Sequence, residues 1–262
     1  MRRSLLLVLT ILVWRPHVSA QVVAPGGAIP AVAGTVPGLN GTVWRSDVSV
    51  LNLSSEQTSV ILILFPDLTK DPVQFEIQER GPYTIEGFGQ LTLKNVVSSE
   101  FNLPGKKGGL SVISTDGAPL AIASRTFTYA PTGGGTFGLN VNGVVAGDTA
   151  WIPNVEHDAF FRTNVGIFLP ISPPQGQSVG FTVTVFDDDG TQVASRSISF
   201  DQAGLIQRNL DYIGVDEALL DGWIEIRCDD PTYLWYGYAT IIDEVTGDSV
   251  YRPAIGHDPT GP

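Results

Sequence analysis

Trp44-Arg45-Ser46-Asp47-Val48-Ser49-Val50 returns later in the chain as Phe161-Arg162-Thr163-Asn164-Val165-Gly166-Ile167. Each phrase places an aromatic residue, an arginine and a hydroxyl residue ahead of apolar positions, and the segments that follow the two phrases also correspond. The distance between the phrases is the size of one β-sandwich. The sequence therefore predicts an all-β protein of two tandem antiparallel β-sandwich domains.

Strand signals in the two copies occur in matching pairs. Residues 59–65 match residues 181–186, and both segments run into acidic turns typical of β-hairpins. Residues 120–129 match residues 234–243 in the same way. No long stretch has the 3.6-residue period of a helix. Helical structure is expected only as single turns, which we place within residues 96–101 and 215–220.

The chain divides into a leader and the two copies. Residues 1–20 have the layout of a secretory signal peptide, with Arg2 and Arg3, an apolar run, and the small residues Val18-Ser19-Ala20. The apolar run is about ten residues long, short of the roughly twenty that a membrane-spanning helix needs. We expect cleavage after Ala20, a secreted or cell-surface protein without a transmembrane segment, a first domain over residues 21–137 and a second over residues 138–262.

The composition narrows the classes of partner. The formal net charge is −12, with 15 basic and 27 acidic residues, and a negative surface argues against nucleic acid or an anionic membrane surface as a partner. Charged residues make up only 16% of the chain, beside 29 glycines and 18 prolines, which is typical of turn-rich β structure. The single cysteine, Cys228, alternates with Ile224 and Ile226 and is predicted to be a buried thiol.

Two motifs resemble catalytic or cofactor-binding signatures. Gly176-Gln177-Ser178-Val179-Gly180 fits the G-x-S-x-G pattern of a serine hydrolase, with His257 downstream to complete a triad. A strand follows the motif, however, where a nucleophile elbow requires a helix. The glycine-rich residues 133–138 fit G-x-G-x-x-G, but they too precede turn and strand signals. We therefore expect no catalytic residues, and a serine hydrolase is the least favoured alternative.

Candidate metal ligands occur in three places. Asp187, Asp188 and Asp189 precede Gly190 in a predicted hairpin turn, where aspartate oxygens suit a weak Ca²⁺ site. Aspartate and glycine also favour such a turn for backbone reasons alone, and we prefer this interpretation. The pairs His157-Asp158 and His257-Asp258 are too few to build a zinc site, so both pairs are predicted to be solvated loop residues.

One strand carries aromatic residues on both of its faces. Trp235 falls on one face of the alternation, and Tyr236 and Tyr238 fall on the other. One face must meet the core, and the other is open to three interpretations: an interdomain contact, a partner surface, or a platform on which sugar rings stack. Trp and Tyr are also common in strands, so we prefer the interpretation that both sets are packing residues. For the ligand-binding alternative, these three residues are the candidates.

Arg45 and Arg162 occupy the same place in the two copies. This repetition favours a shared structural task, such as donating hydrogen bonds to backbone carbonyls where a strand begins.

The repeated phrases resemble those of uncharacterised exported bacterial proteins with tandem β-sandwich repeats. The resemblance rests on the Phe161 phrase, the strand and Asp-Gly hairpin of residues 183–190, and Ser124-Arg125-Thr126-Phe127 before the glycine-rich segment. The second copy departs from it, with Tyr238-Ala239-Thr240-Ile241 in place of the Ser124 phrase. The resemblance implies secreted or surface β-sandwich modules and supplies no catalytic residues.

Taken together, these patterns predict an exported, non-catalytic structural, adhesion or interaction protein. The alternative is a carbohydrate-binding module that uses the aromatic platform, with Ca²⁺ as its one candidate cofactor. The expected partner is an extracellular protein or a polysaccharide.

Overall fold

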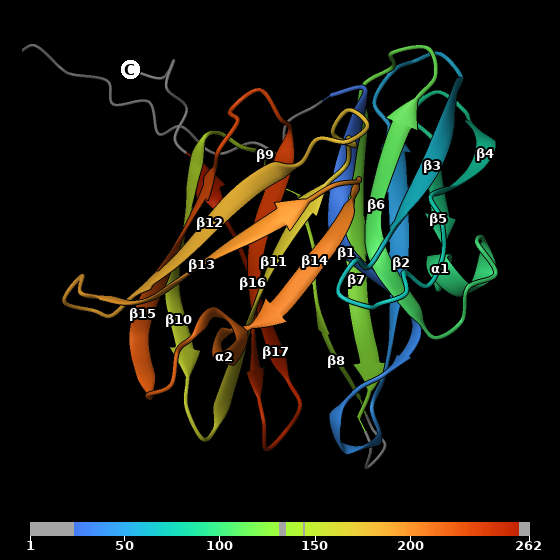
Figure 1. The fold of residues 1–262 in the computed structure, drawn as a ribbon. Coiled ribbons are helices and arrows are strands. Elements are labelled where there is room, and N and C mark those ends of the chain that lie inside the picture. Colours follow the sequence, from blue (N-terminus) through green and yellow to red (C-terminus); the bar gives the residue numbers. More distant parts are fainter. Residues whose placement is uncertain (1–23, 131–134, 144, 257–262) are drawn as a thin grey trace, which may run out of the picture.

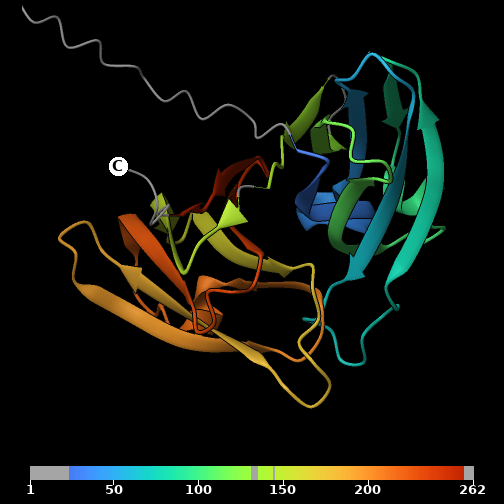
Figure 2. The same ribbon diagram turned by 90° about the horizontal axis from the view of Figure 1, so that it is seen from above.

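The computed structural model describes residues 24–130, 135–143 and 145–256, which form two β domains lying side by side (Figures 1 and 2). Strands dominate both domains, which confirms the all-β prediction. The first domain holds β1 (Gly26–Pro37), a short 3-10 turn (Leu39–Gly41), β2 (Val43–Asn52), β3 (Thr58–Pro66), β4 (Gln78–Ile85), β5 (Gln90–Leu93), α1 (Val96–Ser99), β6 (Lys106–Ser114), β7 (Leu120–Tyr129) and β8 (Thr136–Leu139).

The second domain repeats this plan. It holds β9 (Val145–Ala146), β10 (Thr149–His157), β11 (Phe161–Leu169), β12 (Val179–Phe186), β13 (Gln192–Phe200), β14 (Gly204–Asn209), α2 (Leu210–Ile213), β15 (Leu219–Cys228), β16 (Trp235–Asp243), β17 (Ser249–Pro253) and β18 (Ile255–Gly256). Among the described residues, no helix is long and apolar enough to cross a membrane.

The hydrogen-bonded strand orders of the two domains correspond element by element. The order β4-β3-β6-β1 matches β13-β12-β15-β10, and β5-β2-β7-β8 matches β14-β11-β16-β17. All of these pairs are antiparallel, as sandwich topology requires. The repeated phrase opens β2 and β11, which occupy the same place in the two sandwiches.

An Ile-Pro pair interrupts the opening strand of both copies. The ladder between β1 and β6 shifts register between Ile29 and Val32, and the ladder between β10 and β15 shifts between Ile152 and Val155. Proline has no N–H to donate to a neighbouring strand, so a bulge forms where Pro30 or Pro153 follows the isoleucine.

Each sandwich encloses its own apolar core, built from the inward positions of its alternating strands. Val48, Val60, Leu62 and Leu110 are fully enclosed in the first core. The second core contains Phe181, Trp235 and Cys228, which confirms the buried thiol; burial also raises the pKa of that thiol. Fully burying a side chain of this size is worth about 1.5–3 kcal/mol, so these cores dominate the stability of each domain.

The structure corrects two boundaries. The predicted division between residues 137 and 138 falls inside β8, which pairs with β7 of the first domain, and Val141 still packs in the first core. The turn α1 lies within residues 96–101 as predicted, but α2 precedes residues 215–220. Asn209 caps α2 by accepting a hydrogen bond from the backbone of Tyr212, and Gly214 ends it at a positive φ of 107°.

Candidate functional site: the cleft between the two domains

The two domains meet through a third apolar cluster. The face of β1, β3 and β6 that points away from the first core contacts β11, β14 and β16 of the second domain (Figure 1). The rings of Phe65 and Phe168 pack edge to face at 5.3 Å between centroids, and Phe168 stacks on Tyr236 at 5.9 Å. The buried members of the cluster are Ala28, Phe65, Phe168, Ala203, Leu205, Tyr236 and Tyr238.

Two glycines allow the domains and rings to approach this closely. A Cβ on Gly109 would lie 2.3 Å from the Phe168 ring of the opposite domain. A Cβ on Gly166 would lie 2.2 Å from the Tyr238 ring. Contacts this short do not occur between unstrained carbon atoms, so any larger residue at these positions would displace a ring of the interface.

Polar contacts fix the register of the interface beside the aromatic rings. The backbone N–H of Leu68 donates to the carbonyl of Leu205 at 2.8 Å, which links the end of β3 to β14 across the domains. Lys107 pairs with the buried Asp67 at 3.4 Å and donates to the Gln207 side chain at 3.1 Å. The two sandwiches are therefore joined by specific contacts as well as by apolar packing.

The structure places Trp235, Tyr236 and Tyr238 inside the molecule. Trp235 is 0% exposed in the second core, where its Nε1 donates to the carbonyl of Gly147 at 2.7 Å. Tyr236 and Tyr238 are 6% and 0% exposed and belong to the interdomain cluster. Of the three interpretations left open by the sequence, these positions match the interdomain contact. The rings have no exposed face for a sugar, so an aromatic platform is not supported.

Tyr238 is the most enclosed polar residue of this interface. Its hydroxyl is buried and has no hydrogen-bond partner among the described residues. Burial raises the pKa of Tyr238 well above its ordinary value, with the nearby Tyr251 and Asp67 acting in the same direction. The ring of Tyr251 stacks on Tyr238 at 5.5 Å.

A cleft of about 230 Å³ lies beside the aromatic cluster and is walled by both domains. The first domain contributes β1, β8 and Trp44, and the second contributes β11, β14, β16 and β17. Most of its surface is apolar. Its lining residues are Ala31, Val32, Ala33, Val36, Gly38, Thr42, Trp44, Lys107, Thr126, Leu139, Val141, Arg162, Asn164, Leu205, Gln207, Thr240, Ile242, Gly247, Ser249 and Tyr251.

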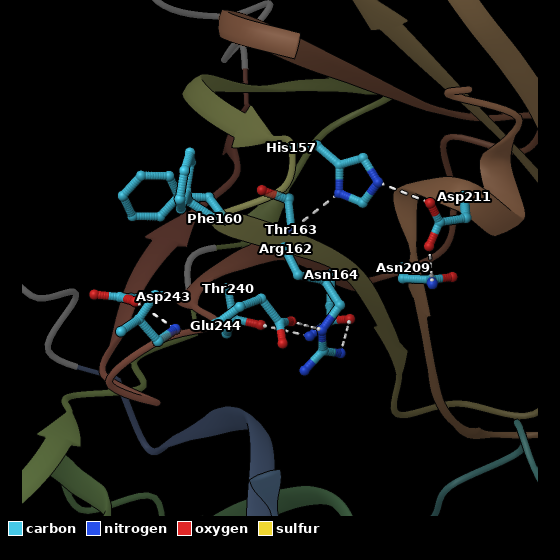
Figure 3. A network of polar contacts seen from close by, with 12 residues as sticks. His157, Phe160, Arg162, Thr163, Asn164, Asn209, Asp211, Thr240, Asp243 and Glu244 are labelled. Atoms are coloured by element: carbon cyan, nitrogen blue, oxygen red, sulfur yellow. Dashed lines mark hydrogen bonds and ion pairs between the residues drawn. The ribbon is translucent and has the colours of Figure 1, made fainter. Parts of the chain in front are cut away.

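Arg162 lies on the wall of this cleft and is held by a small polar network (Figure 3). Its Nε donates to Glu244 at 2.6 Å and its Nη1 donates to Asn164 at 3.1 Å. Asn164 in turn donates to Thr240 at 3.4 Å. Arg162 thus presents its guanidinium from a fixed position on β11.

Arg45, the counterpart of Arg162, has different partners. Its guanidinium lies over the rings of Phe127 and Tyr129, 5.9 Å and 5.0 Å from their centroids. The predicted shared task is therefore wrong, because the neighbouring strands differ: β7 sets Phe127 opposite Arg45, whereas β16 sets Ile242 opposite Arg162. One arginine stacks and the other forms an ion pair.

His157 was predicted to be solvated, but it is 8% exposed and bridges three elements (Figure 3). Its Nδ1 accepts from the Thr163 backbone at 3.4 Å, and its Nε2 lies 2.9 Å from Asp211 at the start of α2. The prediction failed because the end of β10 lies against β11. The adjacent Asp158 accepts hydrogen bonds from the backbones of Phe160 and Phe161 and closes the turn between these strands.

Sequence reasoning missed the hydroxyl residues of the repeated phrase. In the first domain the Ser46 hydroxyl accepts from the backbone of Ala33 at 2.8 Å. In the second, the Thr163 hydroxyl donates to the carbonyl of Glu156. Both side chains are 0% exposed and tie the opening strand to the next one. The signal that could have identified these residues is the hydroxyl side chain at the same position of both repeated phrases.

The serine motif has the context expected from the sequence. Ser178 is exposed in a loop and β12 begins at Val179, so the strand-to-helix turn of a nucleophile elbow is absent there. His257 and Asp258 lie outside the described residues. Of the glycine-rich motif, Gly138 lies within β8 rather than at the start of a helix.

The acidic cluster forms a hairpin turn between β12 and β13. Asp187 accepts from the backbone of Thr191 at 2.7 Å, and Gly190 has the positive φ of 80° that the turn requires. Asp188 and Asp189 are exposed. Among the described residues, no three His, Cys, Asp or Glu side chains converge as metal ligands.

No family model and no curated protein matches the chain. Among solved structures, it is similar to the infectious bursal disease virus VP2 subviral particle, with 12% identity over 90% of this chain and 73% of that one, at a TM-score of 0.25. A putative β-galactosidase from Bacteroides fragilis shares 12% identity over 90% of this chain and 34% of that one, at a TM-score of 0.19. Similarity this low carries no function across.

Proposed function

We propose that this chain is an exported, non-catalytic structural, adhesion or interaction protein whose two sandwiches act as one rigid body. The observation that carries the proposal is the interdomain interface. Phe65 of the first domain packs against Phe168 of the second, which stacks on Tyr236 of its own domain, and the Leu68–Leu205 backbone contact fixes the register of the interface. Tandem domains joined by apolar packing hold their outer surfaces at a fixed distance and angle, which suits a spacer or a composite binding surface.

The polar side chains that suggested chemistry have structural partners, which supports this assignment. His157 connects β10, β11 and α2, and Asp187 holds a hairpin turn. The leader composition and the resemblance to exported bacterial proteins support secretion from a bacterial cell. The acidic composition favours an extracellular protein or a neutral polysaccharide as partner over a polyanion.

The test is co-sedimentation of the secreted full chain with washed cell envelopes and with insoluble polysaccharides, with and without Ca²⁺. We expect retention on envelopes, loss of retention after protease treatment of the envelopes, and no effect of Ca²⁺. Retention on pure polysaccharide would overturn the choice of a protein partner, and retention on neither material would overturn the interaction role. N-terminal sequencing of the secreted chain should begin at Gln21.

The variant Phe168→Ala tests whether the rigid pairing matters. It should reduce retention while each sandwich stays folded, because only the interdomain cluster loses its central ring. Phe160→Ala is the matched control, since this ring is 61% exposed on the loop before β11. Equal retention of both variants would show that the domain pairing is not needed for binding.

A further inference from the structure

We propose that the interdomain cleft binds a long-chain carboxylate, with the alkyl chain between the domains and the carboxylate at Arg162. The apolar walls come from both domains, with Val36, Leu139 and Val141 on one side and Leu205 and Ile242 on the other. An alkyl chain bound there would be shielded from water on both of its sides, and this removal of apolar surface from water is the main driving force for such binding.

The charges of the cleft select an anion. Among the described residues, Lys107 and Arg162 are the only charged residues that line it, although acids outnumber bases 27 to 15 in the chain. Their acidic partners, Asp67 and Glu244, are not part of the lining. A ligand in the cleft therefore meets cationic donors and no carboxylate, which favours an anionic ligand over a cationic one.

The contacts of the two cations place the carboxylate at Arg162. Lys107 already contacts Asp67 and Gln207. Arg162 uses Nε and Nη1 for Glu244 and Asn164, and its Nη2 has no hydrogen-bond partner among the described residues. Ser249 lies in the same cross-strand row as Arg162. Both residues pair with Ile242 of β16, Arg162 from β11 and Ser249 from β17. The Ser249 hydroxyl is buried without a partner in the described structure and lines the cleft, so it supplies a second donor.

Shape and polarity favour a single alkyl chain over a sugar. The cleft follows β1 from Ala31 to Gly38, a distance of about 23 Å at roughly 3.3 Å per strand residue. Several polar groups on the wall already have protein partners: Thr126 bonds to Ser46, and Tyr251 donates to the carbonyl of Asn142. A sugar would find few free groups there.

The experiment is calorimetric titration of the secreted full chain with palmitate, cetyl alcohol and cetyltrimethylammonium. We expect palmitate to bind at least tenfold more tightly than cetyl alcohol, since a charge-assisted hydrogen bond is worth about a factor of ten or more, and the cationic analogue to bind most weakly. Absence of palmitate binding, or equal affinity for the three amphiphiles, would overturn the proposal.

Two variants locate the site. Arg162→Gln should weaken palmitate binding about tenfold or more and leave cetyl alcohol binding unchanged. Val36→Trp should abolish both by filling the cleft. Arg227→Gln is the matched control, since Arg227 is exposed on β15 in the other sheet of the second domain. Circular dichroism checks that each variant is folded; if Val36→Trp fails this check, Ala33→Leu replaces it. Unchanged palmitate affinity in Arg162→Gln and in the folded filling variant would overturn the site.

A final experiment distinguishes binding of free carboxylates from binding to membrane lipids. The chain should not co-sediment with phosphatidylglycerol vesicles, because the cleft holds one chain and the overall charge repels an anionic surface. Vesicle binding without palmitate uptake would overturn the proposal in favour of lipid-surface attachment.

Discussion

The two sandwiches share their strand order but differ in how the opening strand is used. In the first domain β1 pairs with β6 and, from Gly34 onward, also with β2, in a ladder that shifts register between Gly34 and Val36. In the second domain β10 pairs with β15 and β18 and does not join β11. The first sandwich is therefore one eight-stranded sheet folded over its core, whereas the second consists of two separate five-stranded sheets.

The two copies carry different residues where the opening strands diverge. Gly34 pairs with Arg45 and lies so close to α1 that a Cβ there would be 2.8 Å from Val97. His157 occupies the corresponding place in the second copy, counted from the shared Ile-Pro pair. Its imidazole contacts the backbone of Thr163 in β11 and the side chain of Asp211 in α2. The same strand order is therefore compatible with an opening strand that joins the two sheets, as β1 does, and with one that leaves them separate, as β10 does.

The copies also differ in which face they bury. The first domain uses the outer face of β3 and β6 for the interface, and the second uses the outer face of β11 and β16. Corresponding faces therefore do not meet. Phe168 is fully buried in the interface, whereas Leu51, its counterpart on the free face of β2, is only partly buried.

The largest expected effect follows from that pair of positions. Phe168→Ala should lower the free energy of unfolding by about 3–5 kcal/mol, because it leaves a cavity in the interface, and Leu51→Ala should cost clearly less. Urea denaturation of both variants measures this difference. Equal losses would mean that the interface adds no stability beyond that of an ordinary sheet face.

A smaller effect is expected at the glycine that faces Phe168. Gly109→Ala should cost about 1–3 kcal/mol, since its Cβ would overlap the ring. Gly135→Ala is the control, because nothing lies within 4 Å of a Cβ there. Thermal unfolding compares the two, and a neutral Gly109→Ala would show that the ring or the domains shift at little cost.

The hydroxyl links should behave alike in the two domains. Thr163→Val removes the hydrogen bond to Glu156, and Ser46→Ala removes those to Ala33 and Thr126; each substitution should cost about 1–2 kcal/mol. Hydrogen exchange should show faster exchange near Glu156 in the first variant and near Ala33 in the second. An effect in one domain alone would mean that the link is not part of the shared plan.

The smallest effect concerns alkaline pH and the first domain alone. The Tyr83 hydroxyl donates to Glu100 at 2.7 Å, and burial together with this contact raises the pKa of Tyr83 to about 12, from 10.0. The native state holds this proton more tightly, so the stabilisation is complete below pH 10 and is lost as the pH rises through about 12.

Tyr83→Phe should therefore flatten the pH dependence of stability between pH 10 and 12, the interval between the two pKa values. Chemical denaturation at several pH values across this interval tests the expectation. An unchanged slope in Tyr83→Phe would assign the alkaline loss to other tyrosines.

Local patterns predicted much of the fold. The predicted segments 59–65, 120–129 and 181–186 lie within β3, β7 and β12, because alternating apolar residues between turn signals define a strand without help from distant residues. Cys228 was placed correctly by the same alternation. The alignment of β7 with β16 was one residue out: Arg125 lies opposite Asp47 as Thr240 lies opposite Asn164, so Thr240 is the counterpart of Arg125. The correct alignment of β7 with β16 follows from how each strand pairs with its neighbour, and a gapless comparison of the two sequence segments carries no information about that pairing.

By itself, the sequence determined that the chain folds into two β domains with separate cores, since period-two alternation and a repeated phrase are local signals. Only the tertiary structure decided which outer faces meet. Alternation gives every strand two faces but does not say which one a neighbouring domain covers, and Tyr236 and Tyr238 suited three roles until the structure placed β16 against β1 of the first domain. The cleft and its paired cations depend on residues from both domains, far apart along the chain, so no local pattern encodes them.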